Sequence, residues 1–214
     1  MNNRIFIHLK GLLKEEFGFN VSIFLTRFNE IVIETRSDNL YTICSYLKNS
    51  KDCMFEQLID LCGVDFFNYS ESNWDITVSD TGFSRGRNDF VINNDYLFQI
   101  RFLTVYHLLS LTNNVRVTIR NSIFSEDYNV PSVVSIWPSA NWFEREAYDL
   151  FGIFFTNHPF LHRILTDYNF VGHPLRKDFP LIGYKELKYD ATLKKCVYVD
   201  VTIVQETVNT KVIR

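Results

Sequence analysis

The sequence predicts an α+β fold: a small two-layer sandwich of helices on a mixed or antiparallel sheet, followed by a long extended C-terminal arm. Apolar residues recur at helical spacing over residues 5–17 and 139–152, and apolar and polar residues alternate over 115–120. Two prolines and two glycines interrupt residues 170–183. With 214 residues, of which 46% are hydrophobic, the chain can bury one sizeable core and still leave an arm.

The first half of the chain is predicted to begin with a helix over residues 5–17. Two strands follow over 21–25 and 31–35, separated by a short polar turn. Residues 37–39 (Ser-Asp-Asn) supply N-cap candidates for a second helix that continues to Leu47.

Residues 68–94 are rich in Ser, Asn, Asp and Gly, a composition typical of a long surface insertion. The run 82–86 (G-F-S-R-G) could cradle a phosphate, but no strand precedes it and no helix follows it, so we prefer the insertion. A β-rich run resumes at 97–111, and residues 115–120 alternate like a strand with one solvated face.

Residues 139–152 form the best-marked helix, because Pro138 precedes it and Gly152 stands where a left-handed C-cap would end it. The side expected to face the core carries Trp142, Phe143, Ala147, Leu150 and Phe151. The opposite side carries Glu144, Arg145, Tyr148 and Asp149. We expect this charged face to recognise another polypeptide, with Arg145 and Asp149 paired one turn apart.

The acids of this helix could instead serve acid–base chemistry. A free-standing α+β enzyme using Glu144, Glu146 or Asp149 is therefore an alternative, although the sequence provides no accompanying nucleophile, metal-ligand set or cofactor loop. A soluble monomer that turns over a substrate would select the enzyme. An RNA-binding ferredoxin-like module would need aromatic side chains within a basic face, whereas residues 1–152 are net acidic.

His158 and His162 stand four residues apart, across a short helix predicted over residues 160–165. Such a pair can bind zinc when a third ligand is available, but the sequence contains no H-E-x-x-H motif and places His158 at the helix edge. We therefore predict no metal site. Four cysteines without a C-x-x-C pair also argue against an iron–sulfur cluster, and Cys53 and Cys62 are expected to be buried thiols.

The chain is predicted to divide into an α+β domain of residues 1–152 and an arm of residues 153–214. The domain holds 13 basic and 19 acidic side chains, while the arm holds nine basic and six acidic ones. Prolines and glycines within 170–183 exclude a continuous helix, yet the apolar side chains there need a surface to lie on. That surface can be the chain's own domain or a partner subunit, and residues 197–203 alternate like a strand.

Two runs of sequence resemble the signature region of the 30-kDa subunit family of complex I. They are S-A-N-W-F-E-R-E-A-Y-D-L-F-G-I at 139–153 and H-P-F-L-H-R-I-L-T-D-Y-N-F-V-G-H-P-L-R-K-D-F-P-L at 158–181. The family is called subunit 9 when mitochondrially encoded and carries the letter C in bacteria. The resemblance covers about residues 50–214, with Asn169 where glycine is usual and His162 where arginine is usual.

The resemblance implies a cofactor-free structural and assembly subunit of the peripheral arm of NADH:ubiquinone oxidoreductase. FMN, iron–sulfur clusters and ubiquinone would then belong to partner subunits, chiefly the large 49-kDa-type quinone-module subunit and the small iron–sulfur subunits. The alternative is the equivalent subunit of a related membrane-bound hydrogenase-type complex. Under either interpretation the chain has no catalytic residue, binds no nucleic acid and does not span the membrane. No stretch of the sequence is long and apolar enough to form a transmembrane helix.

The expected location is the matrix side of the mitochondrial inner membrane, because 20 Phe and 19 Asn against three Ala suggest an organelle or another strongly AT-biased genome. The cytoplasmic face of a bacterial plasma membrane is the alternative. The residues expected at subunit interfaces are Trp142, Glu144, Arg145, Glu146, Asp149, His158, His173, Arg176, Lys177, Asp178 and Phe179.

Overall fold

The computed structural model describes residues 2–18, 21–67, 100–124 and 128–202, so the insertion predicted at 68–94 lies outside the described residues. The fold is α+β, as predicted, around a five-stranded sheet of order β1-β2-β5-β4-β3. In chain order its strands are β1 (Ser22–Leu25), β2 (Ile31–Arg36), β3 (Gln57–Asp65), β4 (Phe102–Ser110) and β5 (Val115–Ile123). The sheet is mixed, because β2 and β5 run parallel while the other neighbours run antiparallel.

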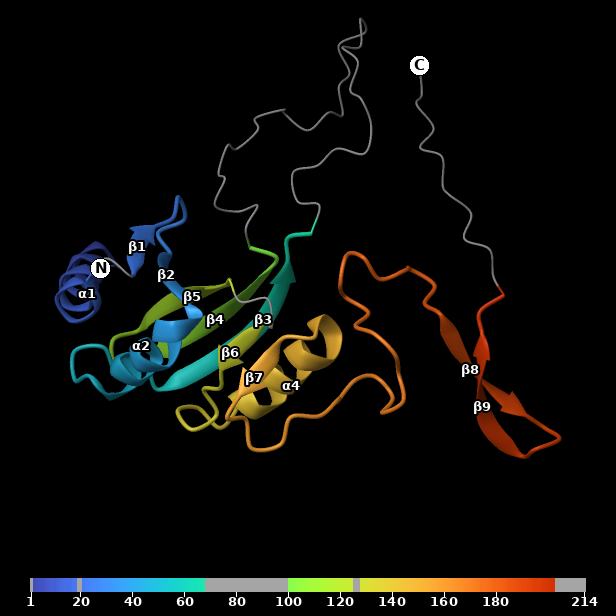
Figure 1. Ribbon diagram of the computed structural model, residues 1–214. Helices are drawn as coiled ribbons and strands as arrows, with labels where there is room; N and C mark the ends of the chain where they lie inside the picture. The colour runs from blue at the N-terminus through green and yellow to red at the C-terminus, as the bar shows by residue number, and fades with distance from the viewer. Residues whose placement is uncertain (1, 19–20, 68–99, 125–127, 203–214) are drawn as a thin grey trace, which may run out of the picture.

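In the described ranges, three helices accompany the sheet: α1 (Asn2–Phe17), α2 (Ser37–Asn49) and α4 (Ala140–Phe151). In Figure 1, α2 and α4 lie in front of the sheet, with the short strands β6 and β7 between them. Leu40, Ile43 and Leu47 of α2 are fully buried and join the sheet's inward residues in one core. Their spacing at i, i+3 and i+7 places them on one helix face, which explains this packing.

Helix α4 packs closely on β3 because Gly63 leaves room for it. A Cβ at Gly63 would lie 2.8 Å from Cδ2 of the Phe151 ring, so only glycine lets that ring approach. The predicted C-cap is confirmed: Gly152 has φ of 74° and donates its N–H to the carbonyl of Tyr148 at 2.9 Å.

Strands β6 (Asn129–Pro131) and β7 (Phe154–Thr156) were not predicted, and they pair in parallel. Both are three residues long, too short for a periodic pattern to reveal. Because Ile153 and Phe155 are buried in the common core, the packed body continues to Thr156 and does not end at Gly152.

Strand β3 was also missed, since its buried residues Leu58, Leu61 and Asp65 stand three and four residues apart instead of alternating, and a bulge lies between Leu58 and Asp60. Cys62 lies on this strand and is exposed, so the prediction that it is buried is wrong. Cys53 is buried as predicted. Cys44, for which no prediction was made, is also buried.

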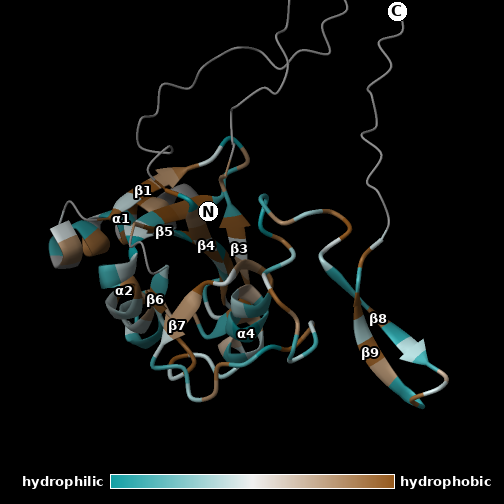
Figure 2. Cartoon of the chain, turned by 45° about the vertical axis from the view of Figure 1, so that its right-hand side comes forward, coloured by the Kyte–Doolittle hydropathy of each residue, from teal (hydrophilic) through white to brown (hydrophobic). Residues whose placement is uncertain are grey.

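Residues 157–184, which we call the strap, run from β7 past α4 without regular secondary structure. The short helix predicted over residues 160–165 is absent, because the backbone there turns around the carboxylate of Asp149. The strap leads into an antiparallel hairpin of β8 (Lys185–Asp190) and β9 (Lys195–Asp200), which Figures 1 and 2 show standing apart from the sheet. No helix among the residues described here is long and apolar enough to cross a membrane.

Candidate functional site

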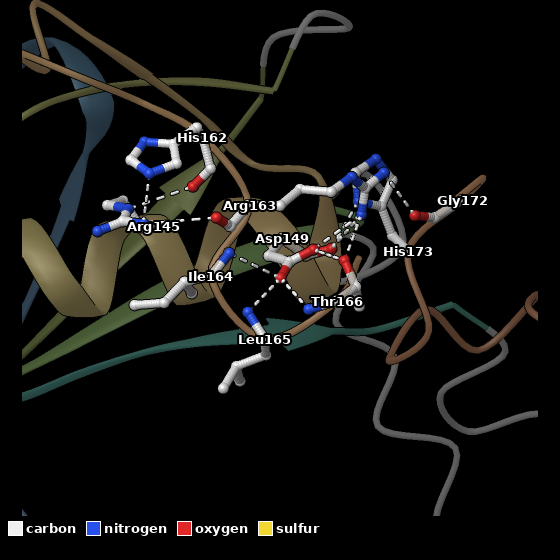
Figure 3. Close-up of polar contacts among 9 residues, drawn as sticks. All are labelled: Arg145, Asp149, His162, Arg163, Ile164, Leu165, Thr166, Gly172 and His173. Carbon is white, nitrogen blue, oxygen red and sulfur yellow. Dashed lines mark hydrogen bonds and ion pairs between the residues drawn. The ribbon is translucent and has the colours of Figure 1, made fainter. Parts of the chain in front are cut away.

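The carboxylate of Asp149 is the centre of the strap's attachment to α4 (Figure 3). It is fully buried, and its Oδ2 accepts main-chain N–H groups from Ile164, Leu165 and Thr166 at 3.1, 2.8 and 2.8 Å. Oδ1 accepts from the guanidinium of Arg163 at 2.8 Å and from the Thr166 hydroxyl. Burial by itself would raise the pKa of Asp149, but these hydrogen bonds outweigh it and lower the pKa to about 2.

Glu144 lies five residues earlier on the same helix and is also fully buried. Its two oxygens accept the Ser132 hydroxyl at 2.6 Å and the main-chain N–H of Val133 at 2.8 Å. Burial raises the pKa of Glu144 to about 7, although both hydrogen bonds act in the opposite direction. This carboxyl therefore fixes the loop after β6 from inside the fold.

These contacts correct the predicted orientation of the helix. Glu144 and Asp149 were placed on an exposed charged face, but they point into the chain's own structure, where backbone donors compensate for their burial. Trp142, placed on the core side, is instead 59% exposed. The expected Arg145–Asp149 pair is not formed, because Asp149 is paired with Arg163.

Arg145 binds the strap instead. Its Nη2 donates to Nε2 of His162 at 2.7 Å, and its Nε donates to the His162 carbonyl at 3.3 Å. The guanidinium also lies over the exposed Trp142 ring, 5.2 Å from its centroid. The partly exposed Arg145 thus binds the strap at His162, while the buried Asp149 binds it at residues 163–166.

The second half of the strap crosses the end of α4. Leu175 donates its N–H to the carbonyl of Leu150 at 3.1 Å, and Arg176 Nε donates to that of Phe151 at 2.6 Å. His173 Nδ1 donates to the Asp149 carbonyl at 2.9 Å. A Cβ at Gly152 would lie 2.6 Å from His173 Nε2, so strap side chains also pack directly against the helix C-cap.

A third buried carboxylate, Asp65 at the end of β3, fastens the strap to the sheet. Its Oδ2 accepts the main-chain N–H of Lys177 at 2.9 Å. Next to it, Arg101 donates to the carboxylate of Asp178 at 2.6 Å. Charge-assisted bonds to residues 162–166 and to residues 177–178 make the strap part of the body, although its backbone is irregular.

The predicted interface residues therefore divide into three groups. Those buried within this chain are Glu144, Asp149 and the side chain of His158. Those partly exposed are Arg145, His173, Arg176 and Phe179, and those exposed are Trp142, Glu146, Lys177 and Asp178. Asp65 and Arg101, which hold the strap, were not predicted, because only the fold brings their charges to it. Arg163 of the strap itself was not predicted either, because only the fold brings it to Asp149.

Exposed large hydrophobic side chains gather on the strap and the hairpin. They are Phe160, Leu165, Tyr168, Val171, Leu175, Leu181, Tyr184, Leu187, Tyr189, Leu193, Tyr198 and Val199. We call these twelve side chains the apolar band. The high apolar content of this irregular segment of the sequence had predicted that it needs a surface to lie on. A monomer that exposes so much apolar surface is unusual.

The polar groups of the site are arranged to hold backbone. The Ser132 hydroxyl donates to Glu144, whose other oxygen accepts the main-chain N–H of Val133. Within the described part of the chain, no three His, Cys, Asp or Glu side chains are grouped to hold a metal ion. The absence of a cofactor stays a prediction.

Residues 33–185 match the family described as the respiratory-chain NADH dehydrogenase, 30 kDa subunit. A protein of Legionella pneumophila (strain Corby), named as a subunit of NADH-quinone oxidoreductase, is 43% identical over 203 residues, which cover 94% of this chain and 89% of that protein. The protein of the same name from Coxiella burnetii (strain Dugway 5J108-111) is 43% identical over 204 residues, covering 94% and 90%.

These relatives are bacterial, which favours the bacterial alternative and gives no support to the mitochondrial location expected from composition. A solved chain of the membrane-bound sulfane sulfur reductase, an archaeal respiratory membrane complex, is 18% identical, with a TM-score of 0.57 over 82% of this chain and 86% of that one. At that identity the likeness concerns the fold alone. Because both bacterial relatives are named as subunits of NADH-quinone oxidoreductase, the hydrogenase-type alternative is less supported than the NADH dehydrogenase one.

Proposed function

Because the chain belongs to the family of the 30 kDa subunit of the respiratory-chain NADH dehydrogenase, we propose that its own role is structural. It is a subunit of NADH-quinone oxidoreductase, the enzyme complex that transfers electrons from NADH to quinone. In this proposal the chain contributes a docking surface and carries no redox cofactor. Its charged groups position backbone, and the chemistry takes place on other subunits.

The apolar band is the observation that carries this proposal. Leu181 is 88% exposed and Tyr168 is 80% exposed. Leaving such large apolar side chains in contact with water is unfavourable compared with burying them. The strap beneath the band is fixed by Asp149, Asp65 and Arg145, so these side chains are presented in a set arrangement. Preorganised aromatic and aliphatic anchors of this kind are typical of strong binding contacts between proteins.

The hairpin supports the same conclusion. Among the described strands, its two six-residue strands pair only with each other, and their side chains are largely exposed. The hydroxyl of Tyr198 donates to Asp167 at 3.0 Å and ties the hairpin to the strap. An isolated two-stranded hairpin is at best marginally stable in water, so we expect a neighbouring subunit to cover it.

The partners we propose are the large 49-kDa-type quinone-module subunit and the small iron–sulfur subunits. FMN, the iron–sulfur clusters and ubiquinone are then bound by partner subunits and not by this chain. The location we propose is the cytoplasmic face of a bacterial plasma membrane, which fits the bacterial relatives.

Two matched substitutions test the proposal. Leu181→Asp places a charge in the apolar band, whereas Phe28→Asp places one at a similarly exposed site, 81% accessible, in the β1–β2 turn. We expect Leu181→Asp to lower the abundance of assembled complex on native gels, while Phe28→Asp leaves it unchanged. NADH:quinone activity per assembled complex should be preserved in both. Normal abundance with lost turnover in Leu181→Asp would refute the structural role.

A further inference from the structure

Glu144 and His158 meet inside the fold without completing a hydrogen bond. Both side chains have no exposed area, and Nε2 of His158 lies 4.0 Å from Oε2 of Glu144. Glu144 belongs to α4, whereas His158 is the second residue of the strap. The gap is about 1 Å longer than a normal N–H···O hydrogen bond.

The protonation of the His158 ring follows from its other nitrogen. The main-chain N–H of Phe160 donates to Nδ1 at 3.1 Å, so Nδ1 presents a lone pair and a neutral ring carries its proton on Nε2. That Nε2 is buried and forms no hydrogen bond with any described residue. Burial lowers the pKa of His158, while the main-chain carbonyl of Asn141 acts in the opposite direction. This carbonyl does not form a hydrogen bond with Nε2.

Glu144 has hydrogen-bond partners in either protonation state. As a carboxylate it accepts the Ser132 hydroxyl and the Val133 N–H. As a neutral acid it can still accept from Val133 and donate its own proton to Ser132 Oγ, 2.6 Å away. Burial brings its pKa to about 7, so both forms are accessible near neutral pH.

We propose that Glu144 and His158 form a proton-linked latch between α4 and the beginning of the strap. With a neutral Glu144 the two side chains stay apart. When Glu144 releases its proton to solvent, the negative charge on Oε2 attracts the unpaired Nε2–H and a hydrogen bond closes the gap. His158 remains neutral in both states, and the Phe160–Nδ1 bond is kept. The latch therefore closes as pH rises through neutrality.

Among the residues that the structure describes, no group around the pair supplies another counter-charge. Cys44 of α2 and Tyr106 of β4 face Glu144, and burial followed by the charge of Glu144 raises the pKa of each, so both are neutral. Arg145 of α4 and His162 of the strap face His158 and oppose a positive charge on its ring. From the loop after β6 only neutral donors, Ser132 and the Val133 N–H, reach Glu144. The Nε2–H of His158 is thus the available donor for the newly charged oxygen.

Infrared difference spectroscopy of the full chain tests whether Glu144 titrates. We expect a carbonyl band of a buried neutral carboxylic acid that disappears as pH rises through about 7. The band should be absent from Glu144→Gln and present in Glu146→Gln, which changes an exposed acid of the same helix. A wild-type chain that shows no carboxylic-acid band titrating near neutral pH, or a band that survives in Glu144→Gln, would overturn the proposal.

Nitrogen NMR of the uniformly labelled wild-type chain tests the latch itself without any substitution. The Nε2–H proton of His158 should shift to higher frequency over the same pH range, while Nδ1 keeps the shift of an unprotonated nitrogen. An Nε2–H signal that does not move while the carboxyl titrates would show that no hydrogen bond closes. A protonated Nδ1 would show that the pair forms an ion pair instead, and either result excludes the latch.

Discussion

Asp149→Asn should release the strap from α4 while leaving the helix itself almost unchanged in size and shape. The substitution removes the negative charge that three main-chain N–H groups and the Arg163 guanidinium now share. The new amide can still accept through its oxygen. Its NH₂ group, however, faces either Arg163 and the Thr166 hydroxyl or the backbone donors, so part of the network is lost in either orientation.

The magnitude follows from two independent considerations. Folding lowers the pKa of Asp149 from an ordinary 3.8 to about 2, which corresponds to about 2–3 kcal/mol of stability near neutral pH. This contribution is fully present above the unfolded pKa and is lost as pH falls through the folded value. Removing one partner of a buried ion pair costs about 3–5 kcal/mol, because the other charge stays buried. We therefore expect a loss of about 3 kcal/mol.

Urea unfolding of the full chain measures this loss, and hydrogen exchange locates it. Exchange of the amides of Ile164, Leu165 and Thr166 should accelerate in Asp149→Asn, whereas that of the β4 and β5 amides should change only through the global loss of stability. Glu146→Gln on the exposed side of the same helix is the matched control and should be within about 0.5 kcal/mol of the wild type. A loss below about 1 kcal/mol in Asp149→Asn, with protection of these three amides intact, would refute the role assigned to this carboxylate.

Further substitutions and conditions test the remaining contacts and the absence of a cofactor. Arg145→Ala removes the contact with His162 and should lower the abundance of assembled complex, while turnover per assembled complex is kept; normal abundance with abolished turnover would identify a catalytic residue. Because folding raises the pKa of Glu144 from 4.5 to about 7, the free energy of unfolding should fall by up to about 3 kcal/mol as pH rises between these values. Urea titrations at several pH values measure this dependence, and Glu144→Gln should remove it. The full chain should show no stoichiometric metal and no visible absorption, and an iron or flavin signal would contradict the cofactor-free proposal. Truncation after Ile182 removes the hairpin and should leave a chain that unfolds cooperatively but does not assemble.

The sequence predicted the parts of the fold that local patterns encode. The strand over residues 115–120 and the helices over 5–17 and 139–152 were predicted because alternation and helical spacing are local properties. Strand β7 and the bulged β3 were missed, since one is very short and the other is irregular. Their pairing depends on strands far away in the sequence.

The orientation of Glu144 and Asp149 could not be predicted in the same way. The amphipathic pattern assigns charged residues to water, which holds unless backbone donors from elsewhere surround the carboxylate. Those donors come from residues 133 and 164–166, whose position is defined only after the strap has folded back. The apolar content of the strap did reveal a binding surface, but not that its inner side is fixed to the chain's own helix.

Hydrogen exchange of the isolated full chain, compared with that of the assembled complex, tests the docking surface most directly. We predict that the amides of Ile164, Leu165 and Thr166 are protected in both, because Asp149 binds them within the chain. The amides of β8 and β9 should exchange rapidly in the isolated chain and become protected in the complex. Equal exchange of the hairpin in the two states would contradict the claim that a partner subunit covers it.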